Sequence, residues 1–135
     1  MLGMKPLLMV SAVFEAGIGI GLLAVPSVVA QVLLGAPLDA PVALTVARVA
    51  GVALLALGVA CWLAASEQSC AARGVVSAMV IYNLGAALVL GVGALGSQLG
   101  GIGLWPAVIL HAAMTVWCIT SLLRKPATSS SGNPY

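Results

Sequence analysis

Residues 74–123 read GVVSAMVIYNLGAALVLGVGALGSQLGGIGLWPAVILHAAMTVWCITSLL, a run of fifty positions without a charged side chain. A helix that crosses the hydrocarbon core of a bilayer needs about 20 apolar residues, so this run is long enough for two crossings. Its middle, GSQLGG at 96–101, is a glycine-rich stretch typical of a turn. We therefore predict membrane-spanning helices near 74–95 and 104–123.

The N-terminal half divides in the same way. Residues 35–41 (GAPLDAP) separate two apolar runs, which predicts spans near 7–33 and 42–65. Pro26 lies inside the first run, where a proline kinks or breaks a helix, so we expect this span to break there and continue as an interfacial turn. Glu15 interrupts the same run and argues against a cleaved signal peptide.

The composition assigns the chain to a membrane. Hydrophobic residues make up 62% of the 135 positions and charged residues only 6%, against about a quarter in soluble domains. Long apolar runs without alternation of apolar and polar residues exclude a transmembrane barrel. The prediction is an all-α, polytopic four-helix bundle over residues 1–125, followed by a disordered tail at 126–135. A net charge of +2 is too small for a nucleic-acid surface.

Basic residues predict the orientation. Lys5, Arg73, Arg124 and Lys125 all fall on one side of the four predicted spans, and Asp39 falls on the other. The positive-inside rule then places both termini in the cytoplasm. We expect a multi-pass protein of the cell inner (plasma) membrane, with the lipid bilayer as its surroundings.

One polar group in each predicted span is a candidate site residue. Glu15, Arg48, Asn83 and His111 lie at depths that differ by only about 7 Å at 1.5 Å per residue, and Tyr82 precedes Asn83. Ionisable side chains in a membrane are costly and usually face protein or water. We therefore predict a buried polar cluster of these five residues.

Within this cluster, Glu15 and Arg48 are expected to form an ion pair, because each charge makes the burial of the other tolerable. Two alternatives stay open: the pair serves only to fix helix register, or Arg48 snorkels to the outer interface. His111 is a hydrogen-bonded core residue, a proton acceptor or a ligand to a haem shared with a partner. One histidine cannot hold a bis-histidine haem within the chain, and no metal site is predicted.

Small residues recur at four-residue spacing in three of the spans. Gly17 and Gly21 form a GxxxG pair, and Ala47 with Gly51 and Ala87 with Gly91 continue the pattern in the second and third spans. Such spacing allows helix backbones to approach closely. The three cysteines have no CxxC spacing, which argues against a thiol-disulfide relay.

Residues 47–58 (ARVAGVALLALG) resemble the arginine-glycine helix of DoxX-like membrane proteins. The resemblance implies a small four-helix membrane protein, and some members of that family are associated with quinone-linked sulfur oxidation. The family has no agreed catalytic motif, so no catalytic residue is carried over. We expect a non-catalytic subunit or accessory partner of a larger membrane complex, or a homo-oligomer, with a quinone or lipid as a candidate contact and any cofactor unknown.

Two other functions stay open. Residues 13–16 (VFEA) are similar to the first-helix carboxylate segment of small multidrug resistance transporters, which implies a proton-coupled transporter with Glu15 as the carrier. The third is a membrane enzyme that uses Glu15 and His111 as acid and base on a lipophilic substrate.

Overall fold

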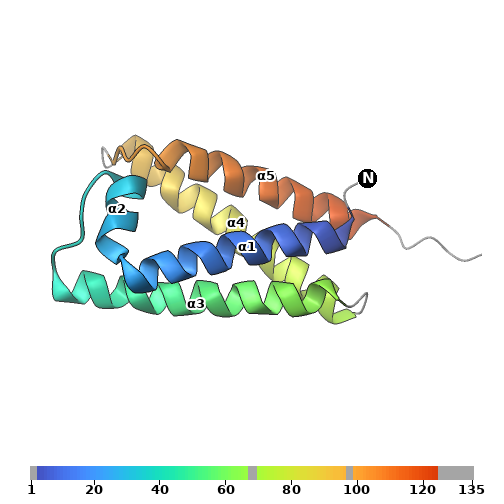
Figure 1. Cartoon of the computed structure of the whole chain (residues 1–135). Helices are drawn as coiled ribbons and strands as arrows, with labels where there is room; N and C mark the ends of the chain where they lie inside the picture. The colour runs from blue at the N-terminus through green and yellow to red at the C-terminus, as the bar shows by residue number, and fades with distance from the viewer. Residues whose placement is uncertain (1–2, 67–69, 97–98, 125–135) are drawn as a thin grey trace, which may run out of the picture.

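The computed structural model describes residues 3–66, 70–96 and 99–124, and all regular structure in these ranges is helical. These residues form five helices (Figure 1), four of which are long and apolar enough to cross a membrane. The predicted all-α fold is confirmed, and four helices have the length and composition expected of the four predicted spans. The tail at 126–135 and the centre of the 96–101 turn lie outside the described residues. The helices are α1 (Met4–Ala24), α2 (Pro26–Leu34), α3 (Pro41–Ala65), α4 (Cys70–Gly96) and α5 (Leu104–Leu123).

The first predicted span is two helices, α1 and α2, with the break at the predicted proline. Val25 leaves the helical conformation, with φ −137 and ψ 58, and Pro26 opens α2. Proline suits a first helical position because the amide hydrogen it lacks would have no intrahelical partner there. Helix α2 ends at Gly35, whose φ of +82° lies in the left-handed region that glycine adopts without strain.

Helix α1 packs chiefly against α3, and α4 chiefly against α5. Glycines set the first contact. A Cβ placed on Gly19 would lie 2.8 Å from the Gly51 carbonyl oxygen, and one on Gly58 would lie 2.9 Å from the Ala16 nitrogen. The two backbones therefore touch, as small residues permit in membrane helices.

The predicted GxxxG pair is not the contact. A Cβ on Gly17 would meet nothing within 4 Å, and one on Gly21 would meet the Val29 side chain of α2. The glycine that approaches α3 is Gly19, which lies between them. Gly51, expected from its spacing to Ala47, does lie in the contact.

The two helix pairs meet at the end of the bundle that holds the N-terminus, around the buried side chains of Leu8, Cys61, Val76, Met79 and Cys118. At the opposite end, Figure 1 shows α2 between the pairs. Two backbone hydrogen bonds tie α2 to the segment before α5: Gly100 N donates to Leu34 O at 3.1 Å, and Gly103 N donates to Val32 O at 2.9 Å. Helix α2 therefore closes one end of the space between the pairs.

Candidate functional site

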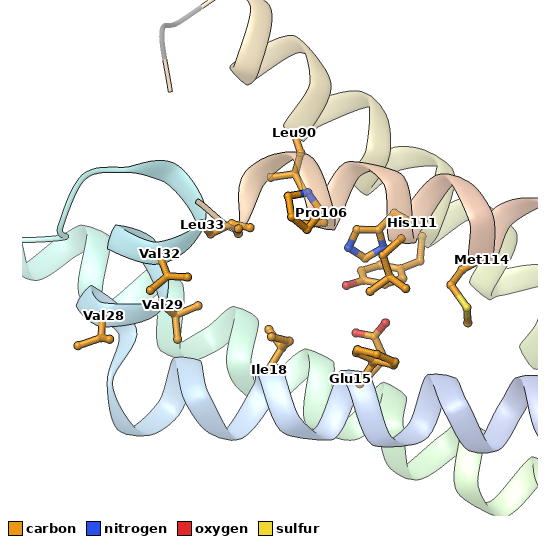
Figure 2. A pocket seen from close by; sticks show the side chains of 15 residues that line it. Glu15, Ile18, Val28, Val29, Val32, Leu33, Leu90, Pro106, His111 and Met114 are labelled. Atoms are coloured by element: carbon orange, nitrogen blue, oxygen red, sulfur yellow. The ribbon is translucent and has the colours of Figure 1, made fainter. Parts of the chain in front are cut away.

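A cavity of about 430 Å³ lies between the two helix pairs, and Figure 2 shows its lining side chains. Helices α1, α2, α4 and α5 all contribute to the wall, with Gly103 just before α5, whereas α3 contributes nothing. The polar members of the lining are Glu15, Tyr82 and His111. Its apolar members are Phe14, Ile18, Val28, Val29, Val32, Leu33, Leu90, Gly103, Pro106, Ala107, Leu110 and Met114.

Glu15 projects from α1 into this cavity. Its side chain is 6% exposed, and it points toward His111 on the opposite wall (Figure 2). Tyr82 lines the same cavity and is close enough to the Glu15 carboxylate for the two groups to interact. Among the described residues, no basic side chain forms an ion pair with Glu15. The carboxyl group therefore depends on the Tyr82 hydroxyl and on whatever occupies the cavity.

Asn83 and His111 form a hydrogen-bonded pair whose donor and acceptor can be assigned. The Asn83 Nδ2 donates to the Met79 carbonyl oxygen at 2.8 Å, and the Asn83 Oδ1 lies 2.9 Å from His111 Nδ1. Because a carbonyl oxygen only accepts, Nδ2 must face Met79 and Oδ1 must face the imidazole. Nδ1 therefore carries the hydrogen, and in the neutral ring Nε2 keeps its lone pair.

Tyr82 connects the two sides of the cavity wall. Its ring stacks edge-on against the His111 imidazole, with the ring centroids 5.6 Å apart and the planes at 83°. Edge-to-face packing of this kind holds both rings in place. The structure thus brings together Glu15, Tyr82, Asn83 and His111, four of the five residues predicted for the polar cluster.

The tautomer of His111 is directly measurable. With the ring neutral, nitrogen NMR of the histidine-labelled protein in nanodiscs is expected to show Nδ1 as the protonated nitrogen. Asn83→Leu removes the acceptor that fixes it, so the spectrum should move toward the Nε2-protonated form. Ser77→Leu changes an exposed position of the same helix and should leave the spectrum unchanged. An Nε2-protonated ring in the unmodified protein would contradict the assignment.

The predicted ion pair between Glu15 and Arg48 is wrong. The Arg48 side chain is exposed on the outside of α3. Gly51 lies beside Gly19, and Gly58 lies beside Ala12 and Ala16, so Arg48 falls level with the end of α1. This places Arg48 about nine residues, or about 14 Å, from the level of Glu15 along the helix axis. Glu15 is buried within the bundle and Arg48 is exposed on its outside, so the two charges do not meet.

The apolar wall from α2 was not predicted. Val28, Val29, Val32 and Leu33 line the cavity, yet in sequence they are indistinguishable from the membrane span that precedes them. The signal that could have found them is Pro26, since a helix that restarts there can fold back toward the bundle.

The cavity is open on one side. Two of its lining residues on α1, Phe14 and Ile18, are each 48% exposed, and Val28 on α2 is 57% exposed. In a membrane these half-exposed apolar side chains would face lipid. A molecule dissolved in the bilayer could reach Glu15 and His111 from that side without passing through water.

No metal-binding set is found within residues 3–66, 70–96 and 99–124, where no three His, Cys, Asp or Glu side chains are grouped as ligands. Cys61 and Cys118 are buried in the core, and Cys70 at the start of α4 is exposed. Glu15, Tyr82 and His111 supply the cavity with groups for hydrogen bonding and proton exchange.

Comparison with known proteins returns no matching family model, no matching curated protein and no matching solved structure. The resemblance to DoxX-like proteins therefore stays a prediction.

Proposed function

We propose that this chain binds an amphipathic, lipid-soluble molecule inside the membrane. The observation that carries the proposal is the composition of the cavity wall. Three polar side chains, Glu15, Tyr82 and His111, lie among an otherwise apolar lining. Ligand sites are commonly concave and apolar, with a few placed polar groups that orient the ligand.

The arrangement of the wall favours a ligand with one polar end. Glu15 and His111 project toward the same space, whereas the lining from α2 is entirely apolar (Figure 2). A small polar head would meet Glu15 and His111, and the apolar body would lie along Val29, Val32 and Leu33. A volume of about 430 Å³ falls within the range of small-molecule sites.

The larger context belongs to the same proposal. A quinone taken up in its reduced quinol form, or another lipid, is a suitable class of ligand, and the chain would act as a subunit or accessory partner of a membrane complex, or as a homo-oligomer. We place it in the inner membrane with both termini in the cytoplasm, on the distribution of its basic residues. A family relationship to DoxX-like proteins is part of this proposal.

Proton-coupled transport is the second candidate, and one observation favours it. A carrier carboxylate must be free of a permanent counter-ion, and Glu15 has no basic partner among the described residues. Catalysis by Glu15 and His111 needs the same cavity and a bound substrate. Both alternatives therefore presuppose the binding step.

A photoreactive lipid tests the binding function. The protein, reconstituted in nanodiscs, is illuminated with a long-chain alcohol that carries a diazirine, and the labelled peptides are mapped by mass spectrometry. We expect saturable labelling of α2 and of the Pro106 to His111 part of α5, which unlabelled alcohol suppresses. Labelling confined to outward-facing residues such as Val46 and Val89, without saturation, would show that the cavity binds nothing of this class.

A further inference from the structure

We infer that the ligand bears a neutral hydroxyl group, an alcohol or a phenol, which donates its hydrogen to Nε2 of His111 beside Glu15. This inference rests on the proposed binding function and specifies the chemistry of the head that the cavity takes.

The orientation of Asn83 decides which nitrogen of His111 carries the hydrogen. Its Nδ2 donates to the Met79 carbonyl at 2.8 Å, and its Oδ1 therefore faces His111 Nδ1 at 2.9 Å. Asn83 is 1% exposed, so water does not compete for these bonds. Asn83 thus acts as a positioning residue that holds the hydrogen on Nδ1 and leaves the Nε2 lone pair for another donor.

The described part of the protein supplies no hydrogen-bond donor to the Nε2 lone pair of His111. Among the described residues, no group forms a hydrogen bond with Nε2 of His111. This nitrogen is also not one of the fully buried polar atoms that lack a partner, so another molecule can reach it. His111 lines the cavity, so a molecule in the cavity can supply the donor. Tyr82 carries the hydroxyl group among the lining residues, and no hydrogen bond joins it to His111.

Other head groups fit these partners less well. An ether, ketone or ester oxygen only accepts hydrogen bonds and would face an accepting Nε2, leaving both atoms unsatisfied. A phosphate or carboxylate would place a negative charge beside Glu15. An ammonium head also donates, but it brings a full charge to the depth of Glu15 in the membrane, which is tolerable only where Glu15 is ionised. A hydroxyl group donates without a charge.

Two probes that differ by one methyl group test the inference. Tritiated pentadecyl phenol and its methyl ether share the same apolar body, and only the phenol can donate. Binding is measured on immobilised nanodiscs that contain the protein, with empty nanodiscs as the partition control. We expect the phenol to bind about tenfold more tightly than the ether, the effect of one hydrogen bond.

Variants link the preference to the proposed atoms. Asn83→Leu removes the acceptor that holds the hydrogen on Nδ1 of His111, so the preference for the phenol should fall to less than about threefold. Ser77→Leu on the exposed face of α4 should preserve the preference. His111→Phe keeps a planar ring without the acceptor and should abolish the preference while the ether still binds. Elution as a single folded species and an unchanged helix content are required of each variant. Should Asn83→Leu fail to fold, His111→Phe carries the test.

The possible outcomes distinguish failure of this inference from failure of the proposed binding function. Equal saturable binding of phenol and ether, or tighter binding of the ether, overturns the inference and leaves the binding function standing. Tighter binding of pentadecylamine than of the phenol, lost in Glu15→Gln, overturns it in favour of a cation site. No saturable binding of any probe overturns both.

Discussion

Replacement of Gly19 by leucine is expected to lower the free energy of unfolding by about 3 kcal/mol, the upper part of the usual range for overpacking. A Cβ at this position would lie 2.8 Å from both the Gly51 carbonyl oxygen and the Leu55 nitrogen. Both atoms belong to the backbone of α3, so no side-chain rotation relieves the clash and the helices must separate. Unfolding in mixed micelles of SDS and dodecyl maltoside, followed by tryptophan fluorescence, gives the measurement.

Gly17→Leu is the matched control for this variant. Gly17 lies two residues away on the same helix, and a Cβ there would meet nothing within 4 Å. Because leucine is a better helix former than glycine, this variant should be neutral or slightly stabilising. Equal losses at positions 17 and 19 would contradict the close approach of α1 and α3 at Gly19.

Replacement of Ala107 by tryptophan is expected to weaken the binding of the phenol probe by about thirtyfold, or about 2 kcal/mol. Ala107 on α5 lines the cavity, and an indole group there would occupy the space of the ligand's apolar body. The protein should still fold, because the new side chain enters an existing cavity rather than a packed core. Equilibrium binding of the tritiated phenol measures the effect.

Ala112→Trp serves as the control for the filled cavity. Ala112 is exposed on the same helix and does not line the cavity, so its replacement should leave the affinity within about twofold, as for a surface change. If both tryptophan variants bind the phenol as the unmodified protein does, the ligand occupies another place.

Most of the fold was predictable because the bilayer imposes simple rules on sequence. The length of the uncharged runs and the glycine- or proline-rich turns at 35–41 and 96–101 gave the four spans. Pro26 also gave the break between α1 and α2, since the stereochemistry of proline is local. The side to which α2 folds depends on the hydrogen bonds of its Val32 and Leu34 carbonyls with Gly103 and Gly100. These partners are distant in sequence from α2.

Four of the five residues of the site could be predicted from the sequence, but the contacts between them could not. Glu15, Tyr82, Asn83 and His111 were found because a polar side chain in an apolar helix must face protein. Arg48 met the same criterion, but its long side chain permits an outward position that a shorter one does not. The depth estimate also counted residues from assumed span ends. The register that Gly19 sets with Gly51 moves Arg48 away from Glu15.

The depth of Glu15 has a consequence for which lipids can be ligands. Glu15 lies near the middle of the 21 residues of α1, about 15 Å from either end at 1.5 Å per residue. Glycerophospholipids keep their phosphates anchored at the aqueous boundary and do not bring them to the bilayer midplane. On the proposed function, a head that reaches Glu15 belongs to a molecule whose polar end can leave the aqueous boundary. The cavity would therefore select lipids with small, uncharged heads over the bulk phospholipid around it.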